Sequence, residues 1–253
     1  MSHHEIMKKA STLWQRMGCM RRKELYEVEK TAVIAGATGL VGGELLQLLL
    51  QQQEYGVVIA VGRRSTGVSH PKLEELIWDD SQPEAVLEGR LGGADLFIAT
   101  GTTIKRAGSQ QKFREVDYEL PLRLARSAAT QGADSLAIVS SIGASTSSRY
   151  FYLKVKGELE QRLTELGLRH LVILRPAQLL GNRAENRPGE VWAARLMKPL
   201  QALMVGPLAR YRPIQAATVA AAMLGASRSA SRGGIVLESE QIPVEAAGLK
   251  PIK

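Results

Sequence analysis

A glycine-rich turn between an apolar strand and a helix-forming segment constrains this chain more than any other feature. A β-branched run stops at Gly36, and Gly39 and Gly42 follow at a G-x-x-G-x-x-G spacing before a leucine-rich segment. Gly36 permits a sharp exit from the strand, Gly39 lets the backbone approach a pyrophosphate, and Gly42 lets the helix pack close to the sheet. Free N–H groups at the start of the helix favour phosphate. The turn predicts a dinucleotide site, with further contacts from its other residues: Thr38, Leu40 and Val41.

After this turn, strand-like and helix-like segments alternate along the chain. Such alternation predicts an α/β fold with a Rossmann-type, doubly wound parallel sheet and a small C-terminal lobe. Pro121 predicts a break or kink in the second helical region near residues 117–121. Strands are expected near residues 31–36, 57–62, 74–78, 94–100, 135–141, 171–175 and 234–238. Helices are expected near residues 40–53, 109–131, 151–167, 189–204 and 215–226.

The chain divides into an extension and one domain. Residues 1–29 have the pattern of an amphipathic basic helix. This extension could contact a membrane surface or a partner subunit, but we favour a disordered or mis-started leader. Residues 30–253 predict a single dinucleotide-binding domain, with a substrate lobe from about residue 176.

Composition narrows the class of protein. Cys19 is the only cysteine, so no intrachain disulfide can form, and we expect a reducing, cytoplasmic location. No apolar run is long enough to predict an integral membrane segment. The formal net charge of +8 comes with no nucleic-acid motif, so it favours solubility and an anionic cofactor over nucleic-acid binding. No metal-ligand cluster is visible, and no metal is predicted.

Two arginines follow the second predicted strand, in Val61-Gly-Arg63-Arg64. A site for NAD usually carries an acid here to hold the ribose 2′-hydroxyl, whereas an arginine fork donates charged hydrogen bonds to a 2′-phosphate. Arg63 and Arg64 therefore predict NADPH as the cofactor. The alternative is a solvated basic loop.

Two further strand ends should face the cofactor, because ligands bind at the carboxyl ends of parallel strands. Asp79 follows the third strand and could accept from an adenine amino group or simply begin the next turn. Small polar residues that would let a ribose or nicotinamide lie close end the fourth strand: Thr100, Gly101 and Thr102.

The strongest catalytic pattern is a pair of overlapping Y-x-x-x-K motifs, Tyr150/Lys154 and Tyr152/Lys156. At about 100° per residue, Tyr152 and Lys156 fall within the apolar face of the predicted helix. Tyr150 and Lys154 fall opposite. Because the apolar face must pack on the sheet, where the cofactor lies, we predict that Tyr152 and Lys156 carry the chemistry.

This pair has a specific chemical use. A tyrosine hydroxyl is a weak acid near neutrality, and a lysine one helical turn away stabilises the tyrosinate. We expect Tyr152 to protonate a carbonyl oxygen as hydride arrives from the nicotinamide, and Lys156 to hold the ribose hydroxyls as well. Ser141, in preference to Ser140, is expected to donate to the same carbonyl oxygen.

Six segments together resemble the short-chain dehydrogenase/reductase superfamily: GATGLVG, VGRR, ATGTT, SSIGA, YLKVKGELE and LRPAQLLGNRAENRPGE. Within it they are similar to the atypical group of Tat-interacting-protein-like NADPH-binding oxidoreductases and their bacterial relatives. The resemblance covers residues from about 31 to about 225. It implies a Rossmann fold, bound NADPH, a Ser141/Tyr152/Lys156 constellation, and Arg175 and Pro176 beside the cofactor. It implies no substrate.

Two departures from the superfamily matter. Many members place an asparagine on the long helix before the fifth strand to support the catalytic lysine, whereas Val116-Asp117 stands in that region here. Asp117 could support the lysine differently or be only a helix cap. About 75 residues follow Arg175-Pro176, few beside a typical domain, which argues against a nucleotide-sugar pocket.

Together, these expectations predict that the chain is an NADPH-dependent oxidoreductase that reduces a carbonyl compound. The alternatives are a non-catalytic NADPH-sensing regulator, similar to the NmrA-like proteins, and a nucleotide-sugar epimerase. We expect a small-molecule substrate and leave a homodimer open as the assembly. The loop with Arg183, Glu185 and Arg187 could hold an anionic substrate or form a salt-bridged lid.

Overall fold

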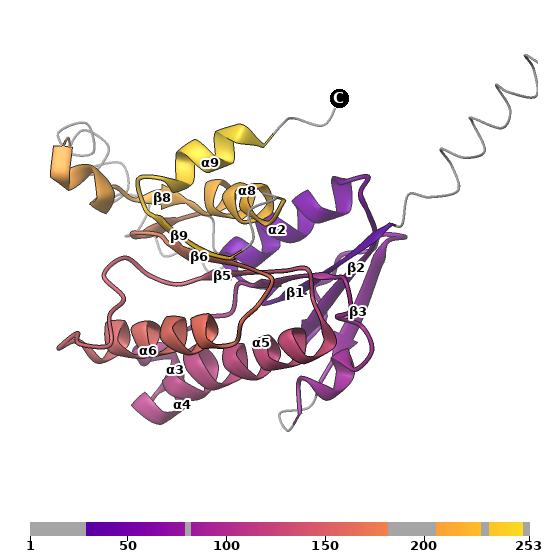
Figure 1. Cartoon of the computed structure of the whole chain (residues 1–253), viewed down its shortest axis with the longest axis horizontal. Helices are drawn as coiled ribbons and strands as arrows, with labels where there is room; N and C mark the ends of the chain where they lie inside the picture. Colours follow the sequence, from indigo (N-terminus) through magenta and orange to yellow (C-terminus); the bar gives the residue numbers. More distant parts are fainter. Residues whose placement is uncertain (1–28, 79–81, 182–205, 229–232, 250–253) are drawn as a thin grey trace, which may run out of the picture.

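A seven-stranded parallel sheet forms the centre of the computed structural model, which describes residues 29–78, 82–181, 206–228 and 233–249 (Figure 1). The strand order is β3-β2-β1-β4-β5-β6-β9, so the winding direction reverses between β1 and β4. This reversal is the switch point at which doubly wound sheets bind ligands. The strands are β1 (Lys30–Ala35), β2 (Tyr55–Gly62), β3 (Leu73–Ile77), β4 (Asp95–Ile98), β5 (Ser135–Val139), β6 (His170–Arg175) and β9 (Gly233–Glu238).

Helices cover both faces of this sheet (Figure 1). One face carries α2 (Leu40–Gln51), α8 (Ala216–Ser227) and α9 (Ile242–Gly248). The other carries the 3₁₀ turn η1 (Ala85–Leu87) and the helices α3 (Ile104–Ala107), α4 (Gln110–Arg114), α5 (Leu120–Gln131) and α6 (Phe151–Glu165). The predicted Rossmann-type, doubly wound fold is confirmed.

The burial of β1 shows why its last four residues, 32–35, are all apolar. Ala32 and Ile34 point into the core beneath α2 and α8, whereas Val33 and Ala35 point into the core beneath α5 and α6. A strand that is covered on both faces cannot alternate apolar and polar residues.

The break or kink predicted near Pro121 takes the form of an irregular turn within a continuous helical backbone. A π-helical turn, η2 (Glu115–Glu119), separates α4 from α5, and Pro121 lies in the first turn of α5. Proline has no N–H to donate, and the irregular π-helical turn before it accommodates this loss within a continuous helical backbone.

The C-terminal part differs in detail from the prediction. A two-residue ladder joins β7 (Leu179–Leu180) to β8 (Ile214–Gln215), which follows the 3₁₀ turn η3 (Gly206–Tyr211). Neither this ladder nor α9 was expected, because such short segments show no periodicity. The expected helix over residues 189–204 and most of the N-terminal extension lie outside the described residues.

Candidate functional site

The glycine turn, which we call the cradle, packs against neighbouring backbone too closely for side chains at Gly36 and Gly42. Gly36 has a φ of +94°, and a Cβ there would lie 2.6 Å from the backbone carbon of Ala99. A Cβ on Gly42 would lie 2.0 Å from the carbonyl oxygen of Gly36. Gly39 is the N-cap of α2 and offers no side chain to cap the helix. The backbone at the start of α2 is therefore open to a phosphate, which is what a dinucleotide requires.

The other predicted contacts of this turn differ in exposure. Thr38 is exposed and Leu40 is half-buried, whereas Val41 is buried in the core beneath α2. Only the backbone of Val41 can therefore serve a ligand.

Arg63 and Arg64 are exposed directly after β2, on a loop that a carboxylate ties to the neighbouring strand. Glu75 of β3 accepts a hydrogen bond from the Ser65 hydroxyl, and from both the backbone N–H and the hydroxyl of Thr66, each at 2.6 Å. The Ser65 bond, followed by those from Thr66, lowers the pKa of Glu75. The backbone that follows the two arginines is thereby fixed.

The end of β4 presents small polar groups beside the glycine turn. The Thr100 hydroxyl oxygen is buried with no hydrogen-bond partner among the described residues, and Gly101 is exposed. The backbone N–H of Thr102 donates to Asp117 Oδ2 at 2.8 Å. An orphaned buried hydroxyl next to the cradle fits a bound polar ligand, since buried hydroxyls normally have partners.

Helix α6 separates the two Y-x-x-x-K motifs by exposure. Tyr150 is 74% exposed and Lys154 is exposed, whereas Lys156 is buried and Tyr152 is half-buried. The ring of Tyr152 packs against Phe113 of α4, with 5.5 Å between ring centroids. The structure thus turns Tyr152 and Lys156 inward.

Lys156 forms an ion pair that the sequence reasoning had not resolved. Its Nζ lies 2.7 Å from Asp117 Oδ1, and the two side chains are 4% and 1% exposed. Asp117 is therefore a direct partner of the lysine and does not cap a helix.

The two serines after β5 have different surroundings. The Ser140 hydroxyl donates to Glu160, a buried carboxylate on α6 that also pairs with Arg175. Hydrogen bonds from Arg175 to Glu160, and then to Glu238, raise the pKa of the guanidinium well above its ordinary value. The Ser141 hydroxyl makes only a long 3.4 Å contact with the Ile142 carbonyl. Ser140 is thus committed to the scaffold, whereas among the described residues the Ser141 hydroxyl is held only by this long contact.

The segment after β6 returns to the glycine turn. The Pro176 carbonyl accepts from the Ile142 N–H at 3.0 Å, which joins the ends of β6 and β5. A Cβ on Gly181 would lie 2.6 Å from a methyl carbon of Leu40 at the start of α2. The segment that follows β6 therefore lies against the start of α2, beside the glycine turn.

Some of the predicted site residues lie outside the part of the chain that the structure describes. Asp79 and the loop with Arg183, Glu185 and Arg187 fall outside the described residues. Sequence reasoning missed Glu75 and Glu160, whose partners lie on other elements or loops of the fold.

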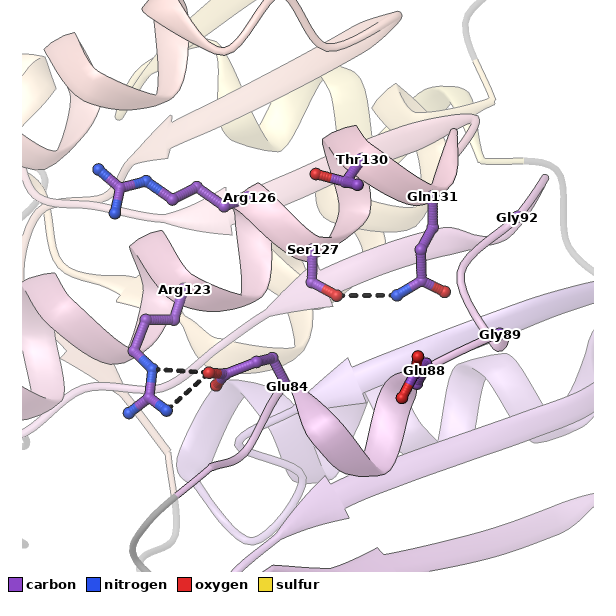
Figure 2. Close-up of a pocket in the computed structure, with 9 residues that line it drawn as sticks. All are labelled: Glu84, Glu88, Gly89, Gly92, Arg123, Arg126, Ser127, Thr130 and Gln131. Carbon is purple, nitrogen blue, oxygen red and sulfur yellow. Dashed lines mark hydrogen bonds and ion pairs between the residues drawn. The ribbon is translucent and has the colours of Figure 1, made fainter.

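A separate cavity of about 650 Å³ lies between η1 and α5 (Figure 2). Arg123 pairs with Glu84 along one side at 2.7 Å, and Gln131 donates to Ser127 at 2.8 Å. None of the predicted site residues lines this cavity.

The described residues contain neither a metal-ligand cluster nor a membrane-spanning helix. Across residues 29–78, 82–181, 206–228 and 233–249, no three His, Cys, Asp or Glu side chains gather as a metal site would need. In the same ranges no helix combines the length and apolar character needed to span a bilayer.

The chain is similar to mitochondrial proteins of yeasts. It is 32% identical to the "Protein FMP52, mitochondrial" of Lodderomyces elongisporus, over 75% of this chain and 83% of that protein. It is 34% identical to the protein of the same name from Candida albicans, over 70% of this chain and 84% of that protein. The family model HIM1 matches residues 94–204.

Solved structures share the fold at low sequence identity. The Bordetella bronchiseptica enzyme WbmH in complex with NAD+ superposes with a TM-score of 0.63 at 15% identity, over 83% of this chain and 76% of that one. A short-chain dehydrogenase family protein from Francisella tularensis superposes with a TM-score of 0.58 at 14% identity, over 84% and 98%. These likenesses show that the chain shares the doubly wound, Rossmann-type fold of those proteins.

The relatives correct two expectations. The cytoplasmic location is wrong, because the curated relatives are named as mitochondrial proteins; a single cysteine excludes an intrachain disulfide and specifies no compartment. The placement among bacterial relatives is also wrong, because these relatives come from yeasts. At this identity and coverage, the chain belongs to the FMP52 family.

Proposed function

We propose that this chain is an NADPH-dependent oxidoreductase that reduces a carbonyl compound. The observation that carries the proposal is the inward placement of Tyr152 and Lys156 on α6, beside the strand ends that surround the glycine turn. A tyrosine and a lysine at this spacing suit proton donation to a carbonyl oxygen.

The cofactor would lie across the carboxyl ends of the strands. Gly36, Gly39 and Gly42 would hold its pyrophosphate, and Thr100 with Thr102 would line its path along β4. The nicotinamide supplies the hydride donor when it is bound. The cradle at the glycines and the orphaned hydroxyl of Thr100 support this placement.

Three residues of the chain would act on the substrate or the cofactor. The Tyr152 hydroxyl donates a proton to the carbonyl oxygen, and the Ser141 hydroxyl donates a hydrogen bond to the same oxygen. The Lys156 ammonium stabilises the tyrosinate that remains and offers donors to ribose hydroxyls. Burial of Lys156 strengthens these interactions, since charges act over a lower dielectric away from water.

The choice of NADPH over NADH rests on Arg63 and Arg64. Both are exposed at the end of β2, where a 2′-phosphate would lie in this fold. The tether from Glu75 supports a defined loop at this position.

We also propose that the chain works in mitochondria, as the names of its relatives indicate for them. Fractionation of cells that express the tagged chain tests this location, and recovery only in the cytosol would contradict it.

Fluorescence titration with NADPH and NADH tests the cofactor assignment. A charge-assisted hydrogen bond contributes about 1.5–3 kcal/mol, so NADPH should bind at least about tenfold more tightly than NADH. Equal affinities would remove the assignment to NADPH. Absence of binding to both nucleotides would remove the proposed function.

A further inference from the structure

Asp117 makes two contacts whose partners come from different parts of the fold. Its Oδ1 lies 2.7 Å from the Lys156 Nζ on α6. Its Oδ2 accepts the backbone N–H of Thr102 at 2.8 Å. Both carboxylate oxygens are therefore used, and the side chain is only 1% exposed.

The Thr102 contact lies close to the glycine cradle. Thr102 belongs to the turn that leaves β4, and Ala99 of the same segment lies against Gly36. The carboxylate of Asp117 thus joins the lysine of the Tyr152/Lys156 pair to the backbone beside the dinucleotide turn.

The position of Asp117 depends on an unusual local geometry. It stands in the π-helical turn η2, and such turns insert an extra residue into a helix and often occur at functional sites. The neighbours Glu115 and Glu119 in the same turn are exposed. Asp117 is the acid of this turn that faces inward.

The ion pair also offsets the free-energy cost of burying the Lys156 ammonium. A lysine ammonium that is almost fully buried needs a compensating charge, because an unpaired charge away from water is strongly destabilising. Asp117 supplies that charge while it fixes the direction of the ammonium.

We propose that Asp117 is a positioning residue that anchors the Lys156 ammonium and the Thr102 peptide as one unit. Cofactor binding at the glycine turn is then coupled to the placement of the Tyr152/Lys156 pair. This inference rests on the proposed function, since it assigns Lys156 a role toward the cofactor.

Two substitutions in the full chain separate the two contacts. Asp117→Asn keeps an oxygen that can accept from Thr102 but loses the ion pair, whereas Asp117→Ala loses both. We expect NADPH affinity to fall about tenfold in Asp117→Asn and further in Asp117→Ala. Glu119→Gln, in the same turn, is the matched control and should bind like the unmodified chain.

A double substitution measures the coupling. Because Asp117 acts through Lys156, adding Asp117→Asn to Lys156→Met should weaken NADPH binding no further than Lys156→Met alone. Amide hydrogen exchange at Thr102 gives a second readout: protection should fall in Asp117→Asn, whose oxygen Lys156 no longer holds in an ion pair, and be lost in Asp117→Ala.

The inference is overturned if Asp117→Asn and Asp117→Ala keep the NADPH affinity of the unmodified chain while their melting temperatures fall. Asp117 would then be a structural residue only. If the unmodified chain binds no NADPH, the proposed function fails first. Thr102 exchange in Lys156→Met then decides the inference: faster exchange supports a shared anchor, and unchanged exchange contradicts it.

Discussion

At the scale of single residues, the site depends on glycines that no other residue can replace. Gly42 and Gly43 are adjacent on α2, yet only at Gly42 would an added Cβ clash with the backbone: the carbonyl oxygen of Gly36 would lie 2.0 Å away. The nearest atom to a Cβ on Gly43 is the Ala37 carbonyl oxygen at 3.6 Å, an ordinary distance.

This difference gives a matched pair of variants. Gly42→Ala should displace the start of α2, abolish NADPH binding and lower the free energy of unfolding by more than about 2 kcal/mol. Gly43→Ala should keep NADPH binding and gain up to about 1 kcal/mol from helix propensity. Urea unfolding and NADPH titration of both variants check this, and tight NADPH binding by Gly42→Ala would refute the role of the cradle.

Residue-level reasoning also shows what a sequence can reveal about a site. Helical phase alone predicted that Tyr152 would face inward and Tyr150 outward, because both lie on one regular helix whose apolar stripe fixes its orientation. It could not predict the partner of Asp117, because no local pattern brings α6 next to η2.

At the scale of elements, the register of β2 against β3 defines the loop that carries the arginines. Ala60 of β2 pairs with Glu75 of β3, and this places the carboxylate beneath Ser65 and Thr66. Such a contact depends on strand pairing, so the sequence offered no signal for it. Because hydrogen bonds lower the pKa of Glu75, the tether is present at neutral pH and is lost only as pH falls through that lowered value.

Glu75→Gln should weaken this tether at neutral pH, since a neutral amide accepts more weakly than a carboxylate. We expect NADPH affinity to fall about threefold with little change for NADH. Glu74→Gln is the control on the same strand, because Glu74 pairs instead with exposed Arg90. If both variants kept the NADPH affinity of the unmodified chain, the loop would not need its tether.

At the scale of the whole molecule, the doubly wound fold could be predicted from the alternation of strands and helices, and the sheet order confirms it. The short C-terminal ladder could not, because two-residue strands are defined by their partners. A location could not be derived from one cysteine, and the names of the relatives corrected it.

The fold also brings distant segments to one place. The glycine turn after β1, the end of β4, Ser141 after β5 and the inward face of α6 all lie at the carboxyl edge of the parallel sheet, and Gly181 closes against Leu40. The proposed reduction would need the cofactor and the proton donor to meet at this edge.

The most direct test of this account compares Tyr152→Phe with Tyr150→Phe. NADPH oxidation is followed with a panel of aldehydes and ketones, using whichever compound the unmodified chain reduces. General acid catalysis contributes about 10²- to 10⁴-fold, so Tyr152→Phe should lose turnover by at least about a hundredfold while it still binds NADPH. Tyr150→Phe, whose tyrosine is 74% exposed, should keep turnover. Full turnover in Tyr152→Phe, or its loss in Tyr150→Phe alone, would contradict the central claim.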